Sequence, residues 1–117
     1  MNKKLAQAAG PQWPAVRDIT LGELLREAAE TVPDRIALIS GVKDPAQRRS
    51  WTYRELYAQA YLAAQVLGQK FQPGERVAVF APNSPEWVML EFACAMAGVV
   101  LVTINPAYRA KEVTYVL

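Results

Sequence analysis

The sequence predicts an α/β fold organised around a parallel βαβ unit over residues 76–104. Residues 76–80 and 99–104 are short, apolar and rich in β-branched side chains, which is typical of strands. The segment from Pro85 to Ala97 has the length of a helix and contains no glycine. Two strands joined by a helical crossover pair in parallel, and the crossover is expected to be right-handed.

Turn and cap residues mark both ends of the predicted helix. The first strand stops at Pro82-Asn83-Ser84-Pro85, a cluster that is typical of a turn. Ser84 is a favourable N-cap, and Pro85 suits the first helical position because its missing N–H would have no helical partner there. Gly98 is expected to end the helix as a C-cap glycine.

The helix from Pro85 to Ala97 is unusually apolar, because Glu86 and Glu91 are its only charged residues. A helix that is apolar on all sides is expected to be buried on all sides. The continuous apolar run Val99–Ile104 is likewise typical of a strand covered on both faces. A chain of 117 residues has little material for such cover. We therefore expect a piece of a larger protein that self-associates when isolated, through its sheet edge and this helix.

Ahead of the βαβ unit, residues 1–18 are predicted to be an N-terminal arm in which Pro11 and Pro14 disfavour regular structure. Trp13 is expected to pin this arm to the body. Thr20 and Glu23 form a capping-box pattern that starts an amphipathic helix, and Pro33-Asp34 ends it. Its apolar positions are Leu21, Leu24, Leu25, Ala28, Ala29 and Val32.

A small hairpin and a second amphipathic helix are predicted next. Ile36–Ile39 and residues 50–53 are the two strands, and the polar loop between them contains Arg48-Arg49, interpreted as a solvated turn. Thr52 and Glu55 form a second capping box, which opens a helix to about Leu67 that Gly68 closes. Its expected buried stripe, whose alanines would allow close approach to a sheet, is Tyr53, Leu56, Tyr57, Ala60, Ala63, Ala64 and Leu67.

Composition excludes several kinds of site. The chain has no histidine, which removes Ser-His and Cys-His catalysis and histidine metal ligands from it. Its single cysteine, Cys94, lies in the apolar helix and is interpreted as a small buried hydrophobe rather than a nucleophile. A net charge of +2 without a basic cluster does not support nucleic-acid binding. No segment is apolar for long enough to span a membrane, and the default expectation is a cytoplasmic protein.

Five short motifs in this order resemble the beginning of the AMP-forming acyl-CoA synthetases, a branch of the adenylate-forming (AMP-binding) superfamily. The resemblance covers about Ile19 to Leu117, and the loop Asn105–Tyr108 is similar to that of the fatty-acyl branch, in particular its medium-chain members. The motifs are Trp51-Thr52-Tyr53-Arg54-Glu55-Leu56, Pro73-Gly74-Glu75-Arg76-Val77-Ala78, Pro82-Asn83-Ser84-Pro85-Glu86-Trp87, Ala97-Gly98-Val99-Val100, and Asn105-Pro106-Ala107-Tyr108 with Glu112.

The resemblance implies that residues 19–117 are the start of the AMP-binding N-terminal domain of a fatty-acid–CoA ligase. Such an enzyme uses ATP with Mg²⁺ to form an acyl-adenylate and pyrophosphate, and coenzyme A then displaces AMP. The phosphate-binding loop of the family, its ribose-binding acid and its catalytic lysine have no counterpart here, and all six glycines are isolated. We therefore expect no catalytic, cofactor-binding or metal residue in this stretch, and no activity from it alone. The chain ends within a predicted helix that begins at about Lys111, which we interpret as a truncation.

Two loops are candidate ligand contacts, because residues 81–84 and 105–108 follow parallel strands, where open α/β sheets bind ligands. Ser84 also opens a helix N-terminus, which can bind an anion. However, Pro82 and Pro85 lack backbone donors, and Asn83, Ser84 and Asn105 are explained as turn and cap residues, so a structural role is favoured.

Three residues of the crossover helix invite a functional interpretation that we do not favour. Glu91 is expected to reach an exposed edge or to pair with an arginine rather than to act as a base. Trp87 and Phe92 are expected to lie in the core or at an interface rather than to line a substrate site. Two alternatives to the ligase scaffold stay open: a free-standing small α/β binding or oligomerisation module without catalysis, and a truncated regulator that oligomerises.

Overall fold

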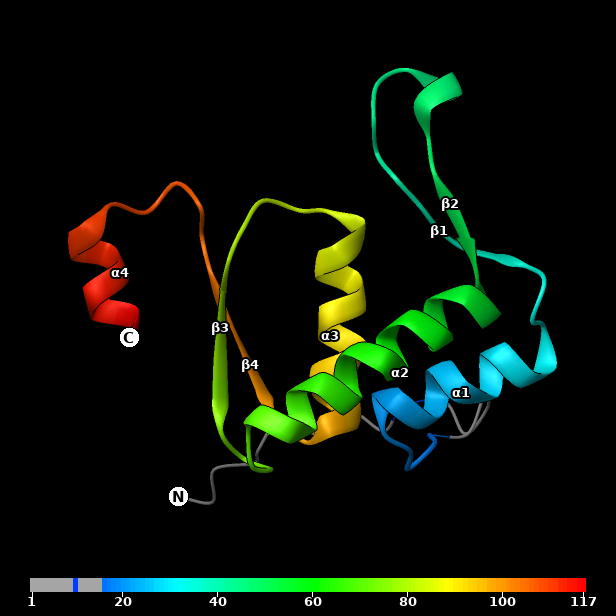
Figure 1. The fold of residues 1–117 in the computed structure, drawn as a ribbon, viewed down its shortest axis with the longest axis horizontal. Coiled ribbons are helices and arrows are strands. Elements are labelled where there is room, and N and C mark those ends of the chain that lie inside the picture. The colour runs from blue at the N-terminus through cyan, green and yellow to red at the C-terminus, as the bar shows by residue number, and fades with distance from the viewer. Residues whose placement is uncertain (1–9, 11–15) are drawn as a thin grey trace, which may run out of the picture.

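The structure is a computed structural model that describes residue 10 and residues 16–117, shown in Figure 1. The predicted role of Trp13 lies outside these residues. Val16 to Thr20 have no regular secondary structure, and the Arg17 side chain forms an ion pair with Glu27. The elements in chain order are α1 (Leu21–Thr31), β1 (Ile36–Ile39), the 3-10 helix η1 (Pro45–Gln47), β2 (Ser50–Thr52), α2 (Tyr53–Lys70), β3 (Arg76–Phe80), α3 (Pro85–Ala97), β4 (Val100–Ile104) and α4 (Ala110–Val116).

The strands of the described residues form two separate sheets of two strands each. β1 and β2 pair antiparallel, as the hairpin prediction requires. β3 and β4 pair in parallel over their whole length, from Arg76 opposite Val100 to Phe80 opposite Ile104. The predicted βαβ unit is therefore confirmed, with α3 as its crossover helix.

Local capping explains where the helices begin. In both capping boxes the hydroxyl of the N-cap threonine accepts from the backbone N–H of the glutamate three residues later, whose carboxylate accepts in return from the threonine N–H. These threonines are Thr20 for α1 and Thr52 for α2. At α3 the hydroxyl of Ser84 accepts from the Trp87 N–H at 3.3 Å. Each cap pairs a backbone donor that the first helical turn leaves free.

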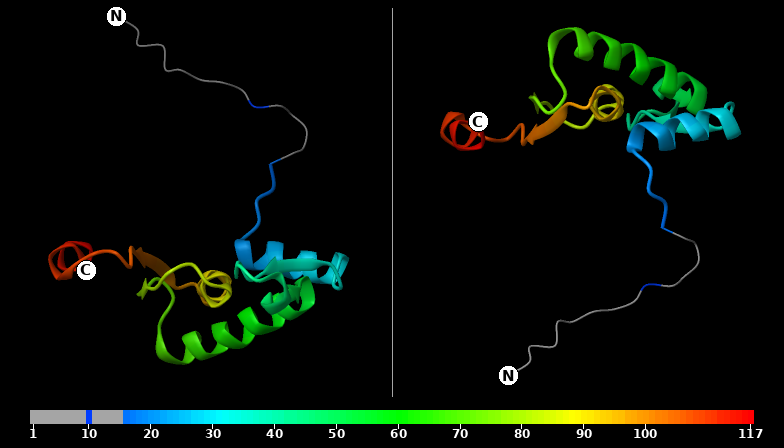
Figure 2. Two further views of the ribbon diagram at one scale, coloured as in Figure 1. Left: turned by 90° about the horizontal axis from the view of Figure 1, so that it is seen from above. Right: turned by 90° about the horizontal axis from the view of Figure 1, so that it is seen from below.

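α3 is the central helix, and α1 and α2 both pack against it (Figure 2). The side chains of Leu25, Leu56 and Met89 bring the three helices together in the core, with Trp51 from the hairpin and Ala60 of α2 beside them. A Cβ at Gly22 would stand 2.9 Å from Met96 Cγ, so glycine is what lets α1 approach α3 this closely. The buried stripe predicted for α2 is confirmed at Leu56, Ala60 and Ala64.

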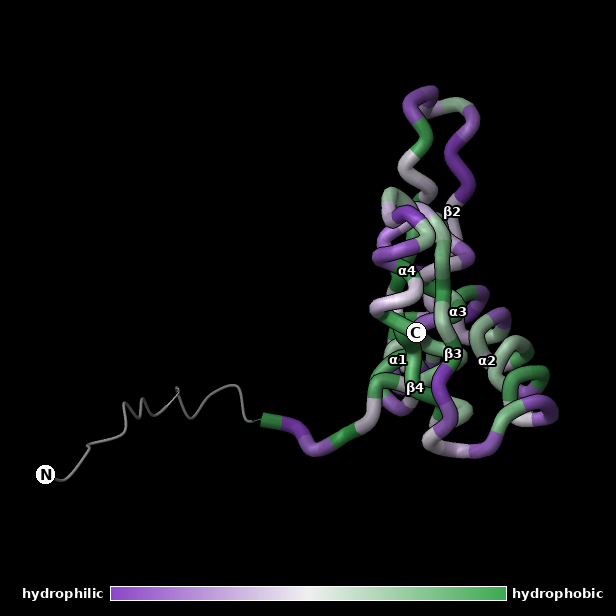
Figure 3. The backbone as a smooth tube through the Cα atoms, turned by 90° about the vertical axis from the view of Figure 1, so that its left-hand side faces the viewer, coloured by the Kyte–Doolittle hydropathy of each residue, from purple (hydrophilic) through white to green (hydrophobic). Residues whose placement is uncertain are grey.

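The alanines of α2 were expected to allow close approach to a sheet, and α2 does contact the β1–β2 sheet, although its main partner is a helix. α2 packs mainly against α3 and also contacts the β1–β2 hairpin, rather than the parallel sheet. The reason is topological, since the crossover helix lies between α2 and the β3–β4 pair. The hairpin reaches away from the helices, and its loop end is mostly hydrophilic in Figure 3.

Gly68 does not end α2, contrary to the prediction. The helix continues to Lys70, and the N–H of Phe71 still donates to the carbonyl of Leu67 at 2.9 Å. A glycine inside a helix costs only about 1 kcal/mol relative to alanine, which one more turn of hydrogen bonds can offset. The turn that follows uses Gly74, whose φ of +89° is a conformation that glycine adopts easily.

The apolar crossover is only partly covered within this chain. Met89, Ala93 and Cys94 are buried, whereas the other apolar side chains of α3 are half-buried, so the expectation of burial on all sides is not met here. Both strands of the parallel sheet also expose large side chains, with Phe80 54% and Val100 48% accessible. The cause is that α1 and α2 cover one side of α3 only. In the described part of the chain, no element packs over the face of the β3–β4 sheet that points away from α3.

α4 and α3 lie on opposite sides of the β3–β4 pair, so α4 is apart from α1, α2 and α3 (Figure 1). It begins at Ala110, one residue before the predicted start, and Val113 is its only side chain that is not exposed. Tyr115 is 93% accessible. Among the residues that the structure describes, no helix combines the length and the apolar character needed to cross a membrane.

Candidate functional site

The two candidate loops meet at one edge of the parallel sheet. Because Phe80 and Ile104 are register partners, the segments that follow them leave the sheet side by side. They line a groove of about 400 Å³, to which Asn83, Trp87, Asn105 and Tyr108 contribute. The position matches the prediction from parallel-strand topology.

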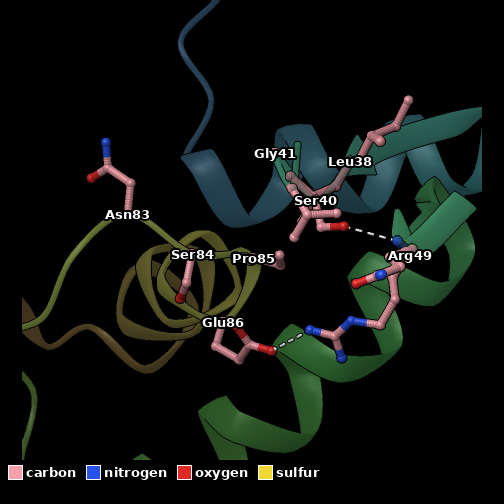
Figure 4. Close-up of a pocket in the computed structure, with 11 residues that line it drawn as sticks. Leu38, Ser40, Gly41, Arg49, Asn83, Ser84, Pro85 and Glu86 are labelled. Carbon is pink, nitrogen blue, oxygen red and sulfur yellow. Dashed lines mark hydrogen bonds and ion pairs between the residues drawn. The ribbon is translucent and has the colours of Figure 1, made fainter. Parts of the chain in front are cut away.

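Two polar side chains of these loops are already hydrogen-bonded to the backbone. Asn105 Oδ1 accepts from the Ala107 N–H at 2.9 Å, which closes an Asx turn. The Ser84 hydroxyl caps α3. Asn83 is exposed, and Figure 4 shows its amide directed away from Arg49 and Glu86. The predicted cap role of Ser84 and turn role of Asn105 are confirmed, and the groove is lined by the exposed amides of Asn83 and Asn105 and by two aromatic side chains, Trp87 and Tyr108.

A second cleft, of about 660 Å³, lies between the hairpin and the N-terminus of α3 (Figure 4). Arg49 crosses it and donates to Glu86 Oε1 at 2.9 Å. The Arg49 guanidinium also stands 5.0 Å from the centre of the Trp51 ring, and the Arg49 N–H donates to Ser40 Oγ at 2.8 Å. The Arg49 side chain is nevertheless 64% accessible, as expected for a solvated turn, so these contacts lie at the surface.

The electrostatics of this cleft do not favour an anionic ligand. Glu86 lies in the first turn of α3, and hydrogen bonding from its own backbone N–H, from the Arg49 guanidinium and from Ser84 lowers the pKa of its carboxyl group. The carboxylate therefore holds its negative charge where the helix dipole would attract an anion. Among the described residues that line the cleft, Arg49 is the only cation, and it is already paired with Glu86.

The remaining candidates fit structural roles. Cys94 is 1% exposed, and burial raises the pKa of its thiol, so the group stays protonated and unreactive. Glu91 reaches the exposed side of α3, as expected, and Phe92 packs against the core. Within the described ranges, no group of three or more Cys, Asp or Glu side chains could hold a metal ion.

Sequence reasoning missed the Arg49–Glu86 contact and the cleft that it crosses. The two residues are separated by 37 positions and share no motif, so only opposite charge connects them in the sequence. The groove at the strand ends, by contrast, follows from the order of the strands. In both the cleft and the groove, the described side chains mainly shape a surface and leave few polar atoms free to take part in a reaction.

Comparisons with known proteins agree on one family. The family model described as "AMP-binding enzyme" matches residues 25–117. The acyl-CoA ligase SID4 of Ajellomyces capsulatus is 38% identical over 116 residues, which are 98% of this chain and 19% of that protein. The mitochondrial medium-chain acyl-CoA ligase ACSF2 of Homo sapiens is 37% identical over 99 residues, 84% of this chain and 15% of that protein.

Solved structures give the same result. The N-terminal domain of FACL13 from Mycobacterium tuberculosis superposes with a TM-score of 0.75 at 32% identity, over 84% of this chain and 24% of that one. The N-terminal subdomain of Klebsiella oxytoca NpsA, in complex with anthranilyl-AMSN, has a TM-score of 0.74 at 30% identity, over 83% of this chain and 24% of that one. The chain thus spans less than a fifth of the length of these two curated relatives and about a quarter of these two solved chains.

Proposed function

The chain belongs to the AMP-binding enzyme family, within its AMP-forming acyl-CoA synthetases, and from that membership we propose that residues 19–117 form the start of the N-terminal large domain of a fatty-acid–CoA ligase. Residues 1–18 precede this domain as an arm. The observation that carries the proposal is the uncovered apolar surface of the βαβ unit. Phe80 and Val100 are each about half accessible, on a parallel sheet of a kind that is normally covered on both faces.

The whole enzyme would join a carboxylic acid to coenzyme A in two steps, with ATP and Mg²⁺, through an acyl-adenylate. Two observations support a fatty acid of medium length as the substrate. The loop Asn105–Tyr108 is similar to that of the medium-chain members, and one group of relatives is named medium-chain acyl-CoA ligase.

Features of the described residues support the proposal that this stretch itself binds neither ATP, Mg²⁺ nor coenzyme A. Pro82 and Pro85 remove backbone donors beside Ser84, and the Glu86 carboxylate would repel a phosphate at the start of α3. No acidic cluster for Mg²⁺ exists in the residues described. We therefore assign no step of the reaction to this stretch. Its contribution is to hold the groove at the strand ends, with Trp87 and Tyr108 as walls, at a fixed place beside the sites that later polypeptide would supply.

The test compares the 117-residue chain with the product of the extended reading frame. Carboxylate-dependent release of pyrophosphate is measured with acids from acetate to palmitate, with and without coenzyme A. We expect release only from the extended product, with the highest rate for acids of intermediate length. Release by the 117-residue chain itself would refute the scaffold role, and an extended product without such activity would refute the ligase assignment.

A further inference from the structure

α1 has an apolar stripe that the rest of the described chain does not cover. Leu25 packs into the core, but Leu21 is 52% and Leu24 45% accessible. With Ala28 and Val32, these two leucines repeat at intervals of three or four residues, so they lie along one side of the helix. The charged residues of α1 lie on the opposite side. Only part of the apolar surface of α1 is therefore packed within the described residues.

A groove of about 240 Å³ runs along this stripe. It is lined by Arg17, Leu24, Glu27, Ala28, Thr31 and Val32. All of these except Arg17 belong to α1 or to its C-cap. Arg17 comes from the segment before the helix, and its guanidinium pairs with the Glu27 carboxylate. The chain that leads into α1 therefore already forms one wall of the groove.

We infer that the N-terminal arm, residues 1–15, docks in this groove, with the indole of Trp13 against Leu24 and Val32. Apart from residue 10, the arm lies outside the described residues, and it joins the described chain just before Arg17. Trp13 is four positions before Arg17, and four residues of extended chain span about 13 Å. The stretch of α1 from Leu24 to Val32 is about 12 Å long. The indole can therefore reach the groove without any movement of α1.

Charge and composition favour the arm as the occupant. The arm contains Lys3 and Lys4 and no acidic residue, whereas α1 carries three glutamates and one arginine. Segments of opposite net charge attract each other. Trp13 is the only aromatic residue of the arm, and a side chain of this size gains much from covering exposed leucines. Pro11 and Pro14 restrict the backbone on either side of it, which lowers the entropy lost on docking.

The pair between Arg17 and Glu27 orients the arm rather than holding it. Both side chains are about half exposed, and an exposed ion pair contributes little to stability. Figure 2 shows residues 16–20 leaving α1 on the side away from α2, so the arm begins beside the exposed side of α1. A segment that is covalently attached next to a groove has a high effective concentration there, which a separate molecule lacks.

The first experiment is fluorine NMR of the whole 117-residue chain labelled with fluorotryptophan. The Trp13 resonance is assigned by its loss in Trp13→Phe, and its position in a free peptide of residues 1–19 marks the undocked arm. We expect the resonance of the parent chain to lie away from the free-peptide position, and Leu24→Gln to move it at least about halfway back. The matched control, Leu62→Gln, makes the same change at an exposed leucine of α2 and should leave the resonance in place. Far-UV circular dichroism checks that each variant is folded.

Three outcomes of this experiment would overturn the proposal. The first is a Trp13 resonance at the free-peptide position in the parent chain, and the second is an equal effect of the two leucine variants. The third is a displacement that grows with protein concentration, which would assign the groove to the arm of a second copy.

Disulfide crosslinking in a Cys94→Ala background tests the location independently. Gln12→Cys combined with Thr31→Cys, in the groove, is expected to form a disulfide at least about tenfold faster than Gln12→Cys combined with Gln65→Cys, on the exposed side of α2. The reason is that docking holds position 12 close to the groove. Equal rates would mean that the arm visits both surfaces alike and would refute the docking. This inference does not depend on the ligase activity.

Discussion

Replacing Gly98 by alanine tests how the end of α3 is built. Gly98 has φ +70° and ψ +21°, a left-handed conformation that costs a residue with a Cβ about 1–2 kcal/mol. The added Cβ would also lie 3.3 Å from the Cβ of Pro73, so the turn before β3 would have to shift. The lower entropy of the unfolded alanine chain offsets about 0.4–1 kcal/mol of this. With the displaced turn included, we expect a net loss of about 1 kcal/mol in the free energy of unfolding.

The same substitution at Gly68 is the matched control. Gly68 lies within α2, and a Cβ there would meet no atom within 4 Å. Alanine has the higher helix propensity, so Gly68→Ala is expected to stabilise the chain by about 0.5–1 kcal/mol. Both variants replace glycine by alanine, and their expected effects on the free energy of unfolding have opposite signs.

The assay is urea unfolding of both variants and the parent chain, followed by far-UV circular dichroism and repeated as thermal melts. At this chain length, 1 kcal/mol corresponds to a shift of about 4 °C in Tm. Measurements are made at low protein concentration, so that self-association does not contribute. A Gly98→Ala variant as stable as the parent would refute the left-handed cap, and a loss in Gly68→Ala would restore Gly68 as the end of α2.

Three further predictions follow from the caps and the buried thiol. Ser84→Ala should lower the free energy of unfolding by about 1 kcal/mol in urea titrations, because the Trp87 N–H loses its acceptor. Ser50→Ala, at an exposed position of β2, should change it by less than about 0.5 kcal/mol, and equal effects would contradict the capping role. Hydrogen bonds from the Thr52 backbone N–H and hydroxyl lower the pKa of Glu55 in the folded chain. The stability that this carboxylate adds is therefore present above its usual pKa of 4.5, and it is lost as the pH falls through the lowered pKa of the folded state. Urea midpoints from neutral pH to about pH 3 should therefore fall less steeply for Glu55→Gln than for the parent chain, and parallel curves would argue against this cause. Buried Cys94 should react with an aromatic disulfide reagent at least about tenfold more slowly in buffer than in urea, and a similar rate in both would mean that α3 is not packed as described.

Local signals predicted the helix starts and the crossover unit well. Thr20, Thr52 and Ser84 each act on a backbone donor within three residues, so their effect depends little on the rest of the chain. The ordered motifs from Trp51 to Tyr108 indicated the family, and the match over residues 25–117 confirmed it. The groove at the strand ends was also predictable, because parallel pairing alone places the two loops together.

Contacts between distant segments decided what the sequence left open. The Arg49–Glu86 pair, the packing of the α2 alanines on α3 and the continuation of α2 past Gly68 each depend on the relative placement of whole elements. Apolar periodicity shows which side of a helix avoids water, but it does not identify the surface that covers that side. By itself, the sequence determined where elements begin, how the crossover runs and which family the chain belongs to, because these follow from interactions over a few residues or from ordered motifs. Only the tertiary structure decided which apolar faces are covered and which, such as the exposed side chains of β3 and β4, are left bare, because burial is a property of how elements pack together in space.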